Sequence, residues 1–324
     1  MTKKTTRPGW RTSFLAVVRY ELLWNIRKKK FIGVFILAFI FPTLALSLPV
    51  IFSNLNNQSI EPNPNYVVTT GAGLGGIGFF LFALVTVMNS ISGEFESGSI
   101  IPLLTKPVSR TTVYLGKIFA ALLTVLGAYI LLTIYMAAGG YIIYGPQNNM
   151  HLIFITLLGS IMSTLVWMSI VLAAGSVSKS SMLAALLGIG VWFGLNIVSG
   201  ILSVFSNQAW IATYFPGSGA SGTTGAPGTI SQINMTTEGV STGTDSIATN
   251  LITYILNPSA NVTFYRIEIT GIGQGQGPRG FTQVPLYTEP LSLVAARSIA
   301  VAAVYIFVFN FIAWYALKRA QLTE

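Results

Sequence analysis

The stretch FIGVFILAFIFPTLALSLPVIF, residues 31–52, decides the class of this protein. It contains no charged residue, and at about 1.5 Å per residue a helix of this length crosses the roughly 30 Å of hydrocarbon in a membrane. Similar apolar runs follow at 67–91, 112–138, 152–175, 182–205 and 291–317. Only 8% of the residues are charged, whereas soluble domains carry about 25%. We therefore expect an all-α polytopic membrane protein with six transmembrane helices.

Basic residues gather between alternate apolar runs, which indicates the orientation of the chain. The clusters comprise residues 3–30, then Lys106, Arg110 and Lys117, then Lys179, and finally Lys318 and Arg319. Loops rich in Lys and Arg stay in the cytoplasm, so we expect both termini to be cytoplasmic in a multi-pass protein of the plasma membrane. Since this orientation accounts for the net charge of +9, we expect no nucleic-acid partner.

The orientation divides the chain into five parts. Residues 1–30 are a cytoplasmic segment, 31–205 hold spans one to five, 206–290 form an extracellular region, 291–317 form span six and 318–324 are a cytoplasmic tail.

Apolar side chains in the first part recur at spacings of three and four, while Arg11, Arg19 and Arg27 lie off this stripe. The stripe consists of Trp10, Phe14, Val17, Val18, Leu22 and Ile26. This pattern predicts an amphipathic helix on the inner membrane surface, in contact with anionic lipids. The alternative is a basic flank with no further role.

The extracellular region changes composition along its length. Residues 217–250 are dominated by Gly, Ser and Thr and hold too few apolar side chains for a core, so we expect a flexible or glycan-covered segment. Residues 259–287 alternate apolar and polar positions around a Gly-rich turn, which predicts a small β-hairpin. Asn57, Asn234 and Asn261 begin sequons and are candidates for glycosylation.

The connection between spans two and three, SGEFESGSIIPLLTKPVSRTTVYLGK (92–117), carries the most informative pattern. Glu94 and Glu96 suit the first turn of a short helix because of the helix dipole. Gly98 permits a bend, and Leu103 and Leu104 offer an apolar face. Such an element can dock into another protein.

The same stretch resembles the characteristic segment of type-2 ABC transporter permeases, the ABC-2 family. Its order is an acidic stretch, Gly-Ser, Leu-Leu, Pro-Val-Ser-Arg and Gly-Lys. The matching residues are Glu94, Glu96, Gly98, Leu103, Leu104, Pro107, Ser109, Arg110 and Lys117. Pro102 departs from a continuous helix, and the insert between spans five and six is larger than the simplest members have.

The resemblance implies that residues 92–111 form a coupling segment seated in a separate ABC ATPase subunit. The chain would then be the permease of an exporter that moves a lipidic, drug-like or polymeric substrate outward. It would form a homodimer, or a pseudo-dimer with a second permease. ATP and magnesium would be bound by the ATPase, so this chain would hold no cofactor and no metal of its own.

Glycines mark a second pattern. Residues 71–76 (GAGLGG) match a dinucleotide fingerprint, but no βαβ unit surrounds them. Gly71 and Gly75, like Gly190 and Gly194, are four residues apart near or within a span. This spacing predicts close packing of membrane helices, within one protomer or between two.

The sequence offers little for catalysis. It contains no Cys, one His (His151) and one Asp (Asp245), and no phosphate-binding G-x-x-x-x-G-K-[ST] loop. We therefore expect no catalytic residues and no ATPase site. A non-transporting membrane scaffold remains the alternative function.

Overall fold

The computed structural model describes residues 9–27, 29–99, 109–205, 207–224, 238–270 and 280–320. Within these ranges six helical stretches are long and apolar enough to cross a membrane, which confirms the predicted mostly helical, multi-pass class. They are α2 (Lys29–Leu55), α4 (Gly75–Val87) with α5 (Ser92–Glu96), α7 (Arg110–Tyr144), α8 (Ile153–Ser178), α9 (Ser181–Phe205) and α12 (Leu291–Arg319).

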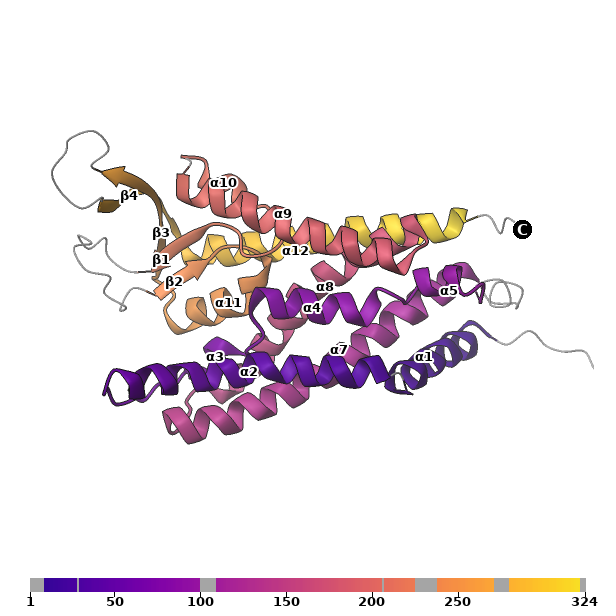
Figure 1. Ribbon diagram of the computed structural model, residues 1–324, viewed down its shortest axis with the longest axis horizontal. Helices are drawn as coiled ribbons and strands as arrows, with labels where there is room; N and C mark the ends of the chain where they lie inside the picture. The colour runs from indigo at the N-terminus through magenta and orange to yellow at the C-terminus, as the bar shows by residue number, and fades with distance from the viewer. Residues whose placement is uncertain are drawn as a thin grey trace, which may run out of the picture.

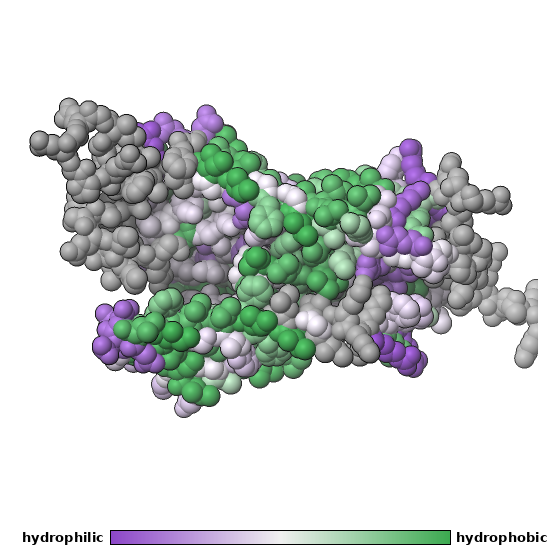
Figure 2. All heavy atoms as spheres, viewed as in Figure 1, coloured by the Kyte–Doolittle hydropathy of each residue, from purple (hydrophilic) through white to green (hydrophobic). Residues whose placement is uncertain are grey.

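The spans run along the long axis of the molecule and define two ends (Figure 1). One end, here called the sheet end, carries four β-strands. The other, here called the α5 end, carries α5, α1 (Trp10–Arg27) and the last turn of α12. Apolar side chains cover the middle of the visible face, while polar ones gather toward both ends (Figure 2). This distribution matches a body that spans a bilayer.

Helix α8 is the centre of the bundle. It is buried over most of its length, whereas α2 and α9 face outward along most of theirs. The ring of Trp167 in α8 is fully buried and lies edge-on against Phe80 of α4, with 5.5 Å between the ring centroids. Tyr129 of α7 is also fully buried and forms a hydrogen bond with Thr164 of α8.

The second span is interrupted, although the apolar run 67–91 predicted a continuous helix. A short helix, α3 (Tyr66–Thr70), ends at Gly71, and α4 begins at Gly75. Gly71, Gly73 and Gly75 have φ values of 63°, 67° and 62°, which residues with a side chain rarely adopt. The glycines therefore break the helix where hydropathy alone shows no boundary.

The four glycines predicted to pack helices differ in their surroundings. A Cβ added at Gly71 would lie 2.6 Å from Cγ2 of Thr156, so this backbone does approach α8 closely. A Cβ at Gly75, Gly190 or Gly194 would meet no atom within 4 Å. Packing at these three positions therefore stays a prediction that concerns contacts with another chain or with lipid.

The region between α9 and α12 forms an antiparallel sheet of order β2-β1-β3-β4. The strands are β1 (Ser221–Thr224), β2 (Glu238–Ser241), β3 (Asn261–Thr270) and β4 (Gly280–Pro290). Strands β3 and β4 pair along their length with an irregularity at Phe264/Tyr265. The described part of this region also contains the helices α10 (Ala209–Ala212) and α11 (Ile247–Leu256) and the short 3-10 helix Thr244–Ser246.

Part of this region enters the bundle, so the expectation of a flexible segment over 217–250 is wrong for its described residues. Ser163 of α8 donates a 2.6 Å hydrogen bond to the carbonyl oxygen of Thr244. The indole N–H of Trp167 donates to Oδ1 of Asp245 over 3.0 Å. Trp167 lies 14 residues into α8, about 21 Å along the helix. The amino-acid composition gave the wrong expectation because small polar residues can be buried when another helix forms hydrogen bonds with them.

Helix α1 packs against α7. It buries Val18, and a Cβ at Gly116 of α7 would lie only 2.7 Å from Cγ1 of Val17. Its opposite face exposes Leu15 and Leu23 among arginines. The helix therefore has one side against the bundle and one mixed apolar and basic side turned outward.

Candidate functional site

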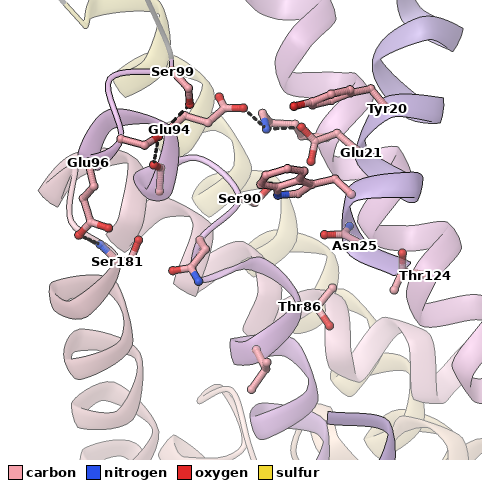
Figure 3. A pocket seen from close by; sticks show the side chains of 16 residues that line it. Tyr20, Glu21, Asn25, Thr86, Ser90, Glu94, Glu96, Ser99, Thr124 and Ser181 are labelled. Carbon is pink, nitrogen blue, oxygen red and sulfur yellow. Dashed lines mark hydrogen bonds and ion pairs between the residues drawn. The ribbon is translucent and has the colours of Figure 1, made fainter. Parts of the chain in front are cut away.

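A buried ion-pair network lies at the α5 end, where α1, α5 and α7 meet (Figure 3). Nζ of Lys117 lies 2.5 Å from Oε1 of Glu21 and 2.7 Å from Oε1 of Glu94. The side chains of Lys117, Glu21 and Glu94 are 3%, 9% and 19% exposed. Water screens such pairs little, so removing one partner would leave a buried charge at a high cost in free energy. We call these three residues the charge triad.

The local backbone places Glu94 in the triad. Helix α5 is a single turn in which the N–H of Glu94 donates to the carbonyl oxygen of Ile91 over 3.1 Å. The turn ends at Gly98, which has a φ of 68° and donates its N–H to the carbonyl oxygen of Phe95. Glu94 consequently points toward Lys117 on α7, whereas Glu96 and residues 97–99 lie exposed.

Glu96 joins α5 to α9. Its Oε1 accepts the backbone N–H of Ser181 over 2.7 Å and the hydroxyl of Ser180 over 3.1 Å. Ser181 is the first residue of α9, so a negative charge lies at the positive end of that helix dipole. A shift of α5 would therefore pull directly on the start of the fifth span.

Arg110 joins the start of α7 to the end of α12. Ser109 caps α7 by accepting the N–H of Thr112 over 3.1 Å, which fixes the first turn that carries Arg110. The guanidinium Nη1 donates to the carbonyl oxygens of Lys318 and Ala320 over 2.9 and 2.8 Å, and to that of Leu317 over 3.3 Å. A cation at the C-terminus of a helix stabilises its unpaired carbonyls.

The connection between α8 and α9 also contacts α5. Nζ of Lys179, which follows α8, lies 5.7 Å from the ring centroid of Phe95. This distance is within the range of a cation–π interaction. Hence α5 and the start of α7 touch side chains or termini of α1, α8, α9 and α12.

The structure brings Glu94 and Lys117 of the predicted site into contact, and it connects Glu96 to α9 and Arg110 to α12. Glu94, Glu96, Ser109, Arg110 and Lys117 all make the contacts above, and Gly98 provides the turn. Three residues of the predicted coupling segment lie outside the described ranges, namely Leu103, Leu104 and Pro107.

Sequence reasoning missed Glu21 and Ser181. Glu21 lies on the buried face of α1, four residues after Val17 and three after Val18. A carboxylate within an apolar stripe was the available signal, because such a group needs a partner when it is buried. Ser181 gave no signal, since any residue that begins a helix offers the same backbone N–H.

The charge triad forms one wall of a cavity of about 540 Å³ between α1, α4, α5 and α7 (Figure 3). Among the described residues, no group of three or more His, Asp or Glu side chains could hold a metal ion. At the sheet end the sequon residues Asn57 and Asn261 are exposed, while Asn234 lies outside the described residues.

The chain matches one protein-family model over almost its whole length. A family model described as ABC-2 family transporter protein matches residues 15–322, which include the charge triad and all six spans. A search of curated proteins gives no match to the chain.

Proposed function

Because the chain belongs to the ABC-2 family of transporter proteins and is a permease subunit of an ABC transporter, we propose that α5 passes the movement of a separate ATPase subunit to the membrane helices. Permeases of this family pair with an ABC ATPase. The ATPase would bind ATP and magnesium, and this chain would supply the path for the substrate.

The single observation that carries the proposal is the set of bonds around α5. Glu94 connects it to α1 and α7 through Lys117, and Glu96 connects it to α9. Arg110, at the far end of the same connection, connects α7 to α12. A displacement of this one-turn helix would therefore move several spans at once.

The bonds separate two tasks within the predicted coupling segment. Glu94 is turned inward, so its task is transmission to the bundle and not contact with the ATPase. Ser97 and Ser99, which follow α5, are exposed and bonded to each other over 2.9 Å, so they suit a docking surface. Removing the charge of Glu94 should accordingly uncouple the complex without removing the ATPase.

The proposed orientation places the α5 end in the cytoplasm and the sheet end outside. Arg11, Arg19 and Arg27 are exposed on α1, and Lys318 and Arg319 end α12 at the same side. The positive-inside rule favours this placement, with both termini cytoplasmic in the plasma membrane. Glycans on Asn57 and Asn261 would then project outward. Helix α1 would lie at the inner membrane surface.

Outward movement of a lipidic, drug-like or polymeric substrate between two permeases is the transport step that we propose. The outward face of α9 supports a dimer, because Gly190 and Gly194 leave open space along it. Apolar side chains such as Leu187 and Ile197 extend the same exposed helix. The partner is a second copy or a second permease.

The test is purification of the tagged full chain from its native membrane, followed by identification of stoichiometric partners. We expect a P-loop ATPase with the wild type and with Glu94→Gln, and its loss with Ser97→Trp. Glu61→Gln, at an exposed position near the sheet end, is the matched control. In proteoliposomes Glu94→Gln should keep the ATPase but lose the effect of the permease on ATP hydrolysis.

Recovery of intact complexes that contain other membrane subunits and no ATPase would favour a scaffold instead. If Ser97→Trp retained the ATPase fully, the docking surface would have to lie elsewhere.

A further inference from the structure

The bundle holds a carboxyl group that the coupling function does not use. Asp245 is the only aspartate of the chain, and its position in the sequence predicted a place in the extracellular region. The structure instead buries it against Trp167, about halfway along α8. Ionisable groups at such a depth in membrane proteins are rare and usually serve a function.

Hydrogen bonds satisfy only one oxygen of this carboxyl group. Oδ1 accepts the indole N–H of Trp167 over 3.0 Å. Oδ2 is also buried, and it forms no hydrogen bond with any described residue. A Cβ added at Gly76 would lie 2.6 Å from Oδ2, so the first turn of α4 closes over this oxygen. A buried carboxylate oxygen without a partner is unfavourable, whereas a protonated carboxyl group carries no charge to solvate.

Asp245 also forms no ion pair with a basic residue of the described ranges. Helices α4 and α8, which pack against it, contain no titratable side chain. The positive end of the α4 dipole favours the ionised carboxylate and offsets its burial only in part. The titratable groups of the other elements nearby are Tyr129 of α7, Glu238 of β2, Tyr254 of α11, and Tyr305 and Arg297 of α12, of which Arg297 is paired with Glu289 over 3.0 Å.

The residues around Asp245 connect separate helices of the bundle. We call residues 242–246 the docked segment. Ser163 of α8 donates a 2.6 Å hydrogen bond to the carbonyl oxygen of Thr244, and Ser298 of α12 donates a 2.9 Å bond to that of Thr242. Asp245 adds the contacts with α8 and α4. A negative charge on Asp245 would therefore stand without a counterion where three helices meet, and undocking would return it to water.

We propose that Asp245 is a proton-binding site inside the membrane domain and that loss of its proton releases the docked segment from the bundle. In the release step the O–H bond of the carboxyl group breaks and the proton passes to water at the sheet end. The docked form joins α4, α8 and α12, and the released form leaves these helices free to separate. In the orientation that we propose, the permease thus responds to the pH outside the membrane.

The first measurement is infrared difference spectroscopy of the chain in nanodiscs between about pH 5 and pH 9. We expect an absorption band of a protonated carboxyl group that disappears as the pH rises. Asp245→Asn should lack this band, and Glu61→Gln, which changes an exposed carboxyl group, should keep it. A band that is absent from the wild type, that persists at all pH values or that remains in Asp245→Asn would overturn the proposal.

The second measurement is amide hydrogen exchange over the docked segment and α11, corrected for the intrinsic effect of pH on exchange. In the wild type, protection should fall at least about tenfold across the pH range in which the infrared band disappears. Asp245→Asn is never charged and should keep its protection throughout. Unchanged protection in the wild type would show that the proton does not control docking.

A second variant keeps the test decisive if Asp245→Asn does not fold. Trp167→Phe removes the hydrogen bond that favours the ionised carboxylate, so the band should disappear at a higher pH than in the wild type. Trp210→Phe, at an exposed position near the sheet, is the matched control and should leave the transition unchanged. An equal transition in Trp167→Phe and the wild type would assign the band to another carboxyl group and overturn the proposal.

Both measurements use the permease without ATPase, nucleotide or substrate, so their outcome is independent of the co-purification test. Absence of an ATPase partner would refute the transport function, and absence of the pH-dependent band would refute only the proton site.

Discussion

Replacing Lys117 by Met should destabilise the protein strongly, because it removes the basic member of the charge triad. The carboxylates of Glu21 and Glu94 would then remain at 9% and 19% exposure without the ammonium group that lies 2.5 and 2.7 Å from them. Breaking a buried ion pair from one side costs about 3–5 kcal/mol. An exposed pair would contribute only about 0–1 kcal/mol. The two cases are far enough apart to distinguish.

The measurement is reversible unfolding of the purified chain in mixed micelles, with increasing SDS and circular dichroism as the signal. Lys117→Met should lower the free energy of unfolding by about 3 kcal/mol or more. The control combines Lys117→Met with Glu21→Gln and Glu94→Gln, which removes every charge of the triad but keeps its shape. Since no unpaired charge is left, this triple variant should recover most of the stability.

The effect of the permease on ATP hydrolysis by the ATPase is the second quantity to measure in these variants. Both Lys117→Met and the triple variant lose the ionic connection between α5 and α7, so both should fail to couple ATP hydrolysis to the membrane helices. A loss below about 1 kcal/mol for Lys117→Met would refute the buried-network reasoning. Full coupling in the triple variant would refute the role of the triad in transmission.

Other predictions concern α12 and the region inside the bundle. Arg110→Gln should speed amide hydrogen exchange in the last turn of α12, and unchanged exchange would contradict its role there. Gly159→Val should undock α11, because a Cβ there would lie 2.7 Å from the backbone N of Ala248; faster exchange across α11 tests this, and Gly190→Val is the control. Burial raises the pKa of the Asp245 carboxyl, although the hydrogen bond from the indole of Trp167 acts in the opposite direction. The folded form thus holds a proton that the unfolded form releases, and stability should fall as pH rises above the ordinary Asp range. Asp245→Asn keeps the acceptor and should flatten this dependence in thermal unfolding at about pH 5 and pH 8; equal slopes would contradict it.

The sequence was sufficient for the spans and for most of the site because both depend on local patterns. Hydropathy located the six runs, since lipid demands long uncharged helices. The acidic and basic residues of 92–117 were recognised from their order along the chain. Their partners were less accessible, because Glu21 is 96 residues from Lys117 and no local pattern connects the two.

The errors have a common physical cause. Hydropathy treats Gly71 to Gly75 as neutral positions, yet their backbone conformation breaks the helix. Composition treats Thr242 and Thr244 as polar surface, yet both are fully buried. The glycines adopt positive φ values, and the two threonines form hydrogen bonds with residues distant in the sequence. Single-residue scales contain neither kind of information.

The docking of Asp245 against α8 has a consequence for biogenesis. Helix α8 is synthesised and inserted well before residue 245 leaves the ribosome. At that stage the indole N–H of Trp167 lacks the Asp245 carboxyl that accepts its hydrogen bond in the folded protein. Insertion of the first five spans therefore cannot complete the core. In the orientation that we propose, the polar loop must first be translocated and then return about halfway along α8. A chain arrested after α9 should accordingly be a substrate for membrane quality control, although five of its six spans are already in place.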